Sequence, residues 1–309
     1  MSQRQLTVLG TASQVPTVQR NHVGFFLRWD HEGILFDPGE GTQRQMALAG
    51  IRAREISIIC LTHFHGDHCL GLPGVIQRLS LDRVEHPVAV VYPASGHHFL
   101  HRLLQAAIFH NRLTVQEYPV SESGLILTRS GFDLTAQPLD HKVDTWGYRL
   151  QEPDARTLLP EHIPGDVHGP ALGLLKSQGW VDSDQGRIFL EDVSVLKPGQ
   201  SFALVMDTKM CPNAELLARG VDLVLSEATY LETEAQQADT YKHLTAAQAG
   251  CMAAHAGAHN LVLAHFSQRY ASLKPFAEQA GRFHPRVIAA VDGQRIDLPE
   301  RRRCLQAKS

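Results

Sequence analysis

Short apolar runs closed by Gly or Pro alternate with stretches of helical periodicity along most of the chain. Runs rich in β-branched and aromatic residues predict strands, and apolar residues spaced three to four apart predict helices. The predicted strands are residues 6–9, 24–28, 34–37, 56–61, 87–91, 147–150, 201–205, 221–225, 260–264 and 287–290. The predicted helices are residues 41–50, 94–109, 244–256 and 271–283. Strands followed by helices in both halves predict a layered α/β architecture.

The pattern breaks between residues 151 and 199, where Pro and Gly interrupt every periodic segment. A stretch this long without regular structure is usually functional or disordered. We therefore predict a core domain formed by residues 1–150 and 200–309, with residues 151–199 inserted into it as an arm.

The composition is ordinary for a soluble enzyme, with 43% hydrophobic and 20% charged residues among 309 and a net charge of −3. No apolar stretch approaches the roughly 20 residues of a membrane helix, and the amino terminus lacks the apolar segment of a signal peptide. We therefore expect a cytoplasmic protein without a membrane or DNA partner. The net charge gives the protein no overall positive potential that would attract RNA. An RNA substrate would therefore have to be bound by local patches of basic residues.

Three histidines and an aspartate are concentrated in the run His63-Phe64-His65-Gly66-Asp67-His68, directly after the predicted strand 56–61. Two residues apart at a strand end, His63 and His65 point to one side, and a turn at Gly66 brings Asp67 and His68 around. Imidazole nitrogens and carboxylate oxygens suit zinc. Chance clustering among 18 histidines is the alternative, but the complete pattern is rare enough to favour half of a two-metal hydrolytic site.

Three further candidate ligands, His141, Asp207 and His265, each follow a strand-like run, as the histidine-rich loop does. Taken singly, each has the ordinary explanation of a turn or cap residue. Their repeated placement predicts that they lie on the same rim of the sheet layer as the loop.

These residues together resemble the metallo-β-lactamase superfamily and, within it, the ribonuclease Z family of tRNA 3′-processing endonucleases. The resemblance covers nearly the whole chain and is carried by Phe36-Asp37-Pro38-Gly39-Glu40-Gly41-Thr42-Gln43, the loop at His63, and His265-Phe266-Ser267-Gln268-Arg269-Tyr270. Other matching segments, in the family's order, are residues 10–16, 20–21, 71–74, 147–149, 169–170, 207–208, 227–229 and 243. The resemblance implies a four-layer αββα metallo-β-lactamase-like sandwich with an inserted arm.

The implied activity is that of a zinc-dependent endoribonuclease, which removes the 3′ trailer from precursor tRNA and leaves a 3′-hydroxyl on the tRNA and a 5′-phosphate on the trailer. The resemblance implies two zinc ions per subunit, although manganese or magnesium stays open. It assigns His63, His65 and His141 to one ion, Asp67, His68 and His265 to the other, and Asp207 to a bridge between them. Such a pair, about 3.5 to 4 Å apart, activates water and neutralises the charge of an in-line displacement at phosphorus.

Cleavage also needs a proton acceptor and a proton donor. Asp67 is the expected acceptor near the attacking water, because one of its oxygens can stay off the metal. The resemblance implies that His243, held by Glu227, protonates the leaving 3′-oxygen. Without the resemblance, His243 is better explained as a residue at the start of the predicted helix 244–256.

The arm corresponds in position to the segment with which members of the family hold the elbow of tRNA, and Gly169-Pro170 matches its short Gly-Pro motif. Such an arm recognises the shape of RNA rather than its sequence. Lys176, Arg187 and Lys197 are candidate phosphate contacts, and a solvated linker is the alternative. Family members are commonly homodimers in which one subunit's arm serves the other's active site, so we expect a homodimer.

Arg20, Asn21 and Arg269 are the other expected substrate-binding residues, because they lie on segments that match the family. The family's Pro-x-Lys-x-Arg-Asn loop has Val18 in place of its lysine. This loop is tied to the handling of the tRNA 3′ end, so the nucleotide at which the chain cuts, and whether it accepts precursors with an encoded CCA, stay open.

Two further departures lie beside the expected site. Met206 replaces the family's glycine before Asp207 and is expected to crowd the site. Ser226 replaces a histidine before Glu227 and is expected to weaken the support of that carboxylate.

Two other functions remain as alternatives. The same metal core would serve a binuclear hydrolase of small phosphodiesters, sulfate esters or lactones, which has no need of an arm. A catalytically silent RNA-binding scaffold would keep the fold, but it has no need of a complete ligand set.

Overall fold

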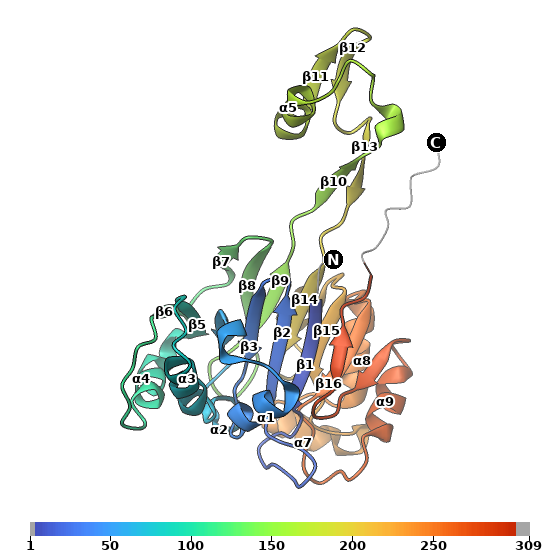
Figure 1. Cartoon of the computed structure of the whole chain (residues 1–309). Helices are drawn as coiled ribbons and strands as arrows, with labels where there is room; N and C mark the ends of the chain where they lie inside the picture. The colour runs from blue at the N-terminus through green and yellow to red at the C-terminus, as the bar shows by residue number, and fades with distance from the viewer. Residues whose placement is uncertain (1–3, 301–309) are drawn as a thin grey trace. The chain divides into compact units, whose positions relative to one another are not determined.

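The protein is described by a computed structural model that covers residues 4–300 (Figure 1). It divides into two compact units. Within the described residues, the first consists of residues 4–150 together with Ser201–Pro299, and the second is Gln151–Gln200.

Seven strands form the first sheet of the larger unit, counted over residues 4–300. From β3 to β6 neighbouring strands are parallel, whereas β18, β1, β2 and β3 pair antiparallel. In spatial order the strands are β18 (Arg295–Asp297), β1 (Arg4–Gly10), β2 (Gly24–Trp29), β3 (Glu32–Phe36), β4 (Ile58–Cys60), β5 (Val88–Pro93) and β6 (Val115–Val120).

A second sheet of seven strands lies in the same unit, within the part of the chain that the structure describes. Strands β14 to β17 are parallel to one another, and β7 pairs antiparallel with β8. In spatial order the strands are β17 (Val287–Ala289), β16 (Asn260–Ala264), β15 (Leu223–Glu227), β14 (Ser201–Val205), β9 (Thr145–Gln151), β8 (Phe132–Leu139) and β7 (Gly124–Arg129).

The two sheets face each other across a shared apolar core. Its side chains come from the inner faces of both sheets, as expected for strands whose alternate residues point to opposite sides. The ring of Phe36 on the first sheet packs against Tyr148 and Phe202 on the second, with centroids 6.4 and 5.6 Å away. Aromatic contacts of this kind stabilise by about 0.5–1.5 kcal/mol beyond the area they bury.

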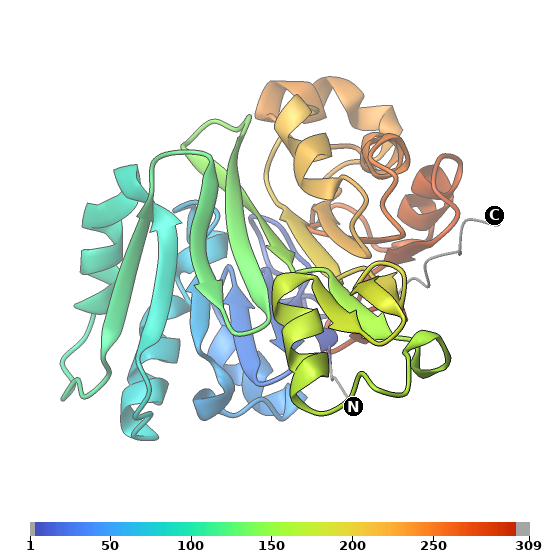
Figure 2. The same cartoon turned by 90° about the horizontal axis from the view of Figure 1, so that it is seen from above.

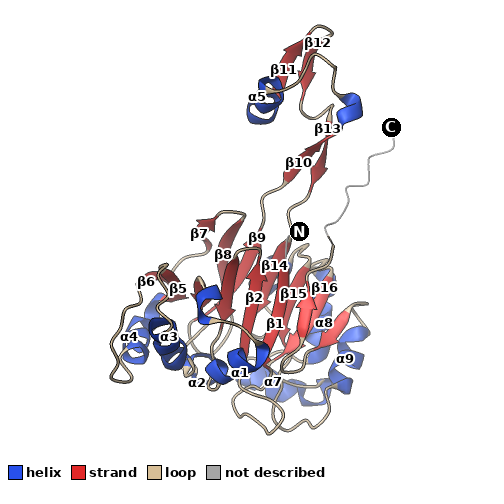
Figure 3. Ribbon diagram, in the orientation of Figure 1, coloured by secondary structure: helices blue, strands red, loops and turns tan. Residues whose placement is uncertain are grey.

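Helices cover the outer face of each sheet (Figures 2 and 3). The outer face of the first sheet packs against α1 (Thr42–Ala49), α3 (Leu72–Leu81) and α4 (His97–Leu104). The outer face of the second packs against α6 (Pro212–Ala218), α8 (Ala246–His255) and α9 (Lys274–Gly281). This order of helix, sheet, sheet and helix confirms the predicted four-layer αββα sandwich.

The helix boundaries follow from local chemistry. Gly41 and Gly50 flank α1 in the left-handed conformation, which glycine adopts without steric cost. The side chain of Thr245 caps α8 by accepting from the backbone N–H of Gln248. The predicted helix 94–109 is too long, because α4 ends at Leu104 and the residues after it carry no helix.

The smaller unit has regular structure of its own, which corrects the expectation of an unpatterned insertion. Strand β10 (Ala155–Leu158) pairs with β13 (Ser194–Lys197), β11 (Trp180–Ser183) pairs with β12 (Gly186–Phe189), and α5 spans Pro170–Gln178. Val167, Leu175, Val181 and Val193 form a small core. The Pro and Gly residues that broke the pattern begin and end these short elements: Pro170 opens α5, and Gly179 closes it with a φ of 86°.

Candidate metal centre

The candidate ligands lie on loops that follow strand ends of both sheets. His63 and His65 come after β4, and α2 (Gly66–Cys69) begins directly behind them. His141 follows β8, Asp207 follows β14, and His265 follows β16. The hydroxyl of Tyr148, on the second sheet, donates a hydrogen bond to the Leu61 carbonyl at 2.6 Å. This bond ties the start of the histidine-rich loop to the opposite sheet.

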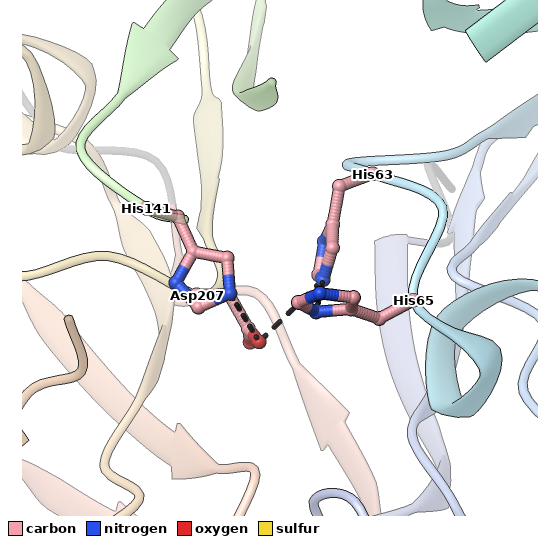
Figure 4. A group of neighbouring side chains, drawn as sticks. All are labelled: His63, His65, His141 and Asp207. Atoms are coloured by element: carbon pink, nitrogen blue, oxygen red, sulfur yellow. Dashed lines mark hydrogen bonds and ion pairs between the residues drawn. The ribbon is translucent and has the colours of Figure 1, made fainter. Parts of the chain in front are cut away.

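The structure brings His63, His65, His141 and Asp207 together, with their ligand atoms within 4.8 Å of one another (Figure 4). Oδ2 of Asp207 lies 3.6 Å from Nε2 of His63 and 3.7 Å from Nε2 of His141. Nδ1 of His65 is 2.9 Å from Nε2 of His63. In Figure 4 these side chains approach a common point from opposite sides.

A second group adjoins the first and consists of Asp67, His68 and His265. Oδ2 of Asp67 lies 3.6 Å from Nε2 of His68 and 3.5 Å from Nε2 of His265. The other oxygen of Asp207, Oδ1, lies 3.4 Å from Nε2 of His68 and 3.2 Å from Nε2 of His265. Asp207 therefore presents one carboxylate oxygen to each group.

Polar atoms without partners show that these residues fit metal ions. Among the described residues, Asp207 Oδ1 and His141 Nε2 are buried and make no hydrogen bond. A buried polar atom left unpaired is costly, whereas coordination of a cation would satisfy both atoms. Imidazole nitrogens with carboxylate oxygens form the donor set that zinc prefers.

Hydrogen bonds behind the ligands fix which nitrogen of each ring faces the centre. His68 Nδ1 lies 2.9 Å from Asp37 Oδ2, and His265 Nδ1 lies 2.8 Å from Thr229 Oγ1. His141 Nδ1 is 3.0 Å from the Lys242 carbonyl. With Nδ1 occupied in this way, Nε2 of each ring is left for the metal, an arrangement that is usual around bound zinc.

Asp37 is a functional residue that the sequence analysis missed. Its oxygens accept hydrogen bonds from the backbone N–H and hydroxyl of Thr62, each at 2.7 Å, besides facing His68. It follows β3, which ends beside β4 in parallel register with Phe36 opposite Cys60. The signal that could have identified it is this strand-end position, which it shares with the ligands.

Burial and charge set the protonation of the centre. Burial lowers the pKa of His63 well below its usual range and also lowers the pKa of His141, so both rings favour the neutral form that binds metal. Burial opposes charge on His68 too, but the nearby carboxylates, Asp207 foremost, outweigh it and raise its pKa well above the usual value. The neighbouring histidines hold the pKa of Asp207 well below its usual range despite its burial.

His243 and Glu227 form a pair beside the candidate metal ligands, with Glu227 fully buried and the His243 side chain 14% exposed. His243 Nδ1 lies 3.0 Å from Glu227 Oε1, which also accepts from the Thr208 backbone N–H at 2.7 Å. Burial opposes charge on His243, but the carboxylates of Glu227 and Asp207 outweigh it and raise its pKa to about 9. The cap of α8 is Thr245, so His243 does not serve as the helix start.

Three residues of the centre have an unusual backbone conformation. Asp37, Asp207 and His265 have φ angles of 43°, 48° and 61°. Left-handed backbone is unfavourable for residues with a Cβ and costs of order 1–3 kcal/mol at each position. The surrounding sheet therefore holds these side chains in place against a local preference.

A cavity of about 640 Å³ opens over the centre. Asp67, Asp207 and His243 contribute to its wall, together with the cations Lys142 and Arg269. The guanidinium of Arg269 lies 5.0 Å from the centroid of the Tyr230 ring. Lys142 was missed in the sequence, where its place next to His141 was the available signal. The cavity thus joins a floor of candidate metal ligands to cationic walls.

The other predicted substrate-binding residues lie elsewhere. Arg20 is buried, and its Nη2 donates to the carbonyls of Ser267 and Tyr270, so it braces the loop that carries Arg269. Asn21 donates to the Glu40 carbonyl at 2.8 Å. Gly169 and Pro170 lie at the start of α5 in the smaller unit.

The family departures have separate structural settings. Val18 is almost fully exposed. Met206 packs into the core between the sheets and does not line the cavity, so the expectation that it crowds the site is wrong. Ser226 is buried, and its hydroxyl donates to the backbone carbonyl of Glu227. The Glu227 carboxylate keeps several donors, among them the Thr229 hydroxyl at 2.6 Å, so its support is intact.

The fold and this centre define a class of metal-dependent hydrolases, and the metallo-β-lactamase superfamily matches residues 20–181 of the chain. Ribonuclease Z of Nocardia farcinica is 51% identical over 305 residues, which cover 98% of this chain and 100% of that protein. Ribonuclease Z of Thermobifida fusca is 49% identical over 308 residues, 98% of this chain and 97% of that protein. The chain belongs to the ribonuclease Z family.

A solved structure resembles the fold over the same extent. Human tRNase Z, short form, matches with a TM-score of 0.71 over 96% of this chain and 99% of that chain, at 24% sequence identity. None of the helices within residues 4–300 combines the length and apolar character needed to cross a membrane.

Proposed function

We propose that the protein is a zinc-dependent endoribonuclease that removes the 3′ trailer from precursor tRNA, leaving a 3′-hydroxyl on the tRNA and a 5′-phosphate on the trailer. The observation that carries this proposal is the position of Asp207, whose two oxygens face two separate groups of histidines. Full-length relatives named ribonuclease Z support the choice of substrate.

The seven candidate ligands would hold two zinc ions, with Asp207 shared between them. A bound zinc pair lowers the pKa of water toward about 7 and neutralises charge on the phosphate. His63, His65 and His141 approach one side of Asp207, while His68 and His265 approach the other.

Asp67 is suited to accept the proton of the attacking water. Its side chain lines the cavity, and its interactions with His68 and His265 lower its pKa despite burial, so it is ionised at neutral pH. As the new bond to phosphorus forms, the proton passes to this carboxylate, and the bond to the 3′-oxygen breaks on the opposite side.

His243 is suited to give a proton to the leaving 3′-oxygen. Glu227 holds Nδ1 of the ring, which leaves Nε2 to act in the cavity that His243 lines. The carboxylate fixes the ring and stabilises its charged form, as a buried acid does beside a catalytic histidine. Lys142 and Arg269, on the same cavity, are placed to contact phosphates of the RNA.

The smaller unit is proposed to be the arm that binds the body of the tRNA. It is a folded element with its own small core, which suits recognition of a rigid RNA surface better than a loose linker would. We further propose a cytoplasmic homodimer in which this arm serves the active site of the other subunit.

The test is to incubate the full chain with precursor tRNAs, with and without an encoded CCA, and to map both cut ends. We expect a single cut that leaves the stated ends, and loss of cleavage in Asp207→Ala. Cleavage elsewhere in the RNA would contradict the proposal. So would a 3′-phosphate on the tRNA and a 5′-hydroxyl on the trailer.

A second variant tests the arm, by joining Gln151 to Gln200 through a short Gly-Ser linker. We expect loss of precursor tRNA cleavage, while hydrolysis of bis(p-nitrophenyl) phosphate continues because the metal centre is intact. Unchanged tRNA cleavage would refute the role of the arm. If the full chain cleaves only the small diester, the protein is instead a hydrolase of small phosphodiesters.

A further inference from the structure

A cluster of potential metal ligands lies on the surface of the larger unit, outside the centre described above. His97 and His101 are one turn apart on α4, and their ring centroids are 4.3 Å from each other. Glu117, on β6, reaches both rings. Its Oε2 lies 3.4 Å from His97 Nδ1, and its Oε1 lies 3.2 Å from His101 Nε2.

The ligand atoms of these residues lie within 4.8 Å of one another, as a shared ion requires. Histidines at positions i and i+4 project from the same helix face, a spacing that zinc sites on helices use. Two imidazoles and a carboxylate suit zinc and its neighbours among the divalent transition metals, and they leave a position for water.

The carboxylate in this cluster is held in place from behind. Tyr92 is fully buried, and its hydroxyl donates to Glu117 Oε2 at 2.6 Å while lying 2.9 Å from His97 Nδ1. Metal ligands are usually oriented by a second group behind them, as Tyr92 orients Glu117 here. Isolated ion pairs on a protein surface generally lack such a group.

The Nε2 atom of His101 gives a further indication. Nε2 of His101 is buried, and among the described residues it is one of the polar atoms without a hydrogen bond, although Glu117 Oε1 is close. The side chains of His97 and His101 are otherwise 61% and 42% exposed, so an ion can reach the cluster from solvent.

We propose that His97, His101 and Glu117 form an additional binding site for a divalent transition metal ion such as Zn²⁺. The ion fastens α4, which carries His97 and His101, to β6, which carries Glu117. Phe64, between two ligands of the main centre, packs on Tyr92 and Phe99, with ring centroids 6.3 and 5.8 Å away. The site therefore steadies the helix against which the histidine-rich loop rests.

The test compares the full chain with His101→Gln and Glu117→Gln by zinc titration of the metal-free protein, with bound zinc counted after gel filtration. We expect each variant to bind one equivalent fewer than the natural chain. The matched control is His98→Gln, which removes an exposed histidine from the same helix outside the cluster and should retain the full count. Circular dichroism of the variants checks that they are folded.

Hydrogen exchange provides the second measurement. Zinc should slow amide exchange across α4 and β6 in the natural chain and in the His98→Gln variant, but not in His101→Gln. The proposal is overturned if all four proteins bind the same number of zinc ions, or if zinc protects α4 equally in the natural chain and in His101→Gln.

Discussion

Oδ2 of Asp37 lies 2.9 Å from Nδ1 of His68, and both side chains are completely buried. The pair links the end of a strand in the first sheet to a candidate metal ligand on α2. Because Asp37 also accepts two hydrogen bonds from Thr62, it orients the ring of His68 rigidly. An aspartate outside the groups of candidate ligands thus helps to define the geometry of the centre.

Asp37→Asn should weaken metal binding without unfolding the chain. The amide NH₂ of asparagine would face Thr62 and His68, which already donate to this side chain. The ring of His68 would then lose its fixed orientation, and the affinity for metal should fall by about 10- to 100-fold. Competition with a chromophoric chelator measures this loss. Asp133→Asn, on an exposed side chain that bonds Thr128, is the control and should bind metal as the natural chain does. Equal affinity in both variants would show that Asp37 has no such role.

Metal removal should lower the free energy of unfolding. Ligand binding to the folded state stabilises it by about 2.7 kcal/mol when free metal is a hundred times its dissociation constant. Urea unfolding with and without a chelator measures the difference. In Asp207→Ala the same chelator should have a much smaller effect, because the shared ligand is gone. If the chelator leaves the free energy of unfolding of the natural chain unchanged, the result argues against metal binding.

Glu227→Gln should separate proton donation from metal chemistry. The amide cannot stabilise a charged His243, so cleavage of precursor tRNA should slow by about 10²-fold or more. Hydrolysis of bis(p-nitrophenyl) phosphate should change little, because nitrophenolate leaves without a proton. Zinc content, measured in parallel, should be unaltered. An equal loss on both substrates would mean that Glu227 supports the metal centre instead.

Glu55 should make stability depend on pH. Although burial opposes its charge, Arg52 and Arg28 outweigh burial and lower its pKa below the usual 4.5. The unfolded chain therefore takes up a proton at a higher pH than the folded chain, so this contribution is complete above pH 4.5 and is lost as the pH falls through the folded pKa.

Glu55→Gln should therefore cost on the order of 1 kcal/mol at pH 7 and progressively less in acid. Urea midpoints from pH 7 down to the acid limit of folding measure the trend, with Glu40→Gln on an exposed side chain as the control. A constant difference between the variant and the natural chain at every pH would contradict the assigned pKa.

The layered core and the grouping of candidate ligands were accessible from the sequence for a physical reason. Parallel strands of one sheet end at the same edge, so the polar residues after β14 and β16 had to lie near each other. The loop after β4 belongs to the other sheet, and it meets them because the two sheets pack face to face. Asp37 follows the same rule but was not recognised, because an aspartate before Pro38 is also a common turn residue. Its role depends on the position of His68, which only the folded structure provides.

Other features could not be derived from local patterns. The residues after Leu104 have apolar spacing that favours a helix, yet α4 stops there. Residues 105–108 are exposed, so no packed apolar face supports a longer helix. The strands of the smaller unit have four residues each, too few to show a period. Its core draws on Val167 and Val193, which are far apart in the sequence. The pairing of Glu117 with His97 likewise needed the fold to bring β6 beside α4.

The left-handed backbone at Asp37, Asp207 and His265 bears on how the protein can evolve. Glycine would suit each of these positions better as a matter of conformation alone, yet it would supply neither a metal ligand nor a group that orients one. The conformational cost at these three positions is therefore tolerated for the sake of their side chains. A drift to glycine at any of them would ease the backbone and leave the ligand set incomplete or unsupported.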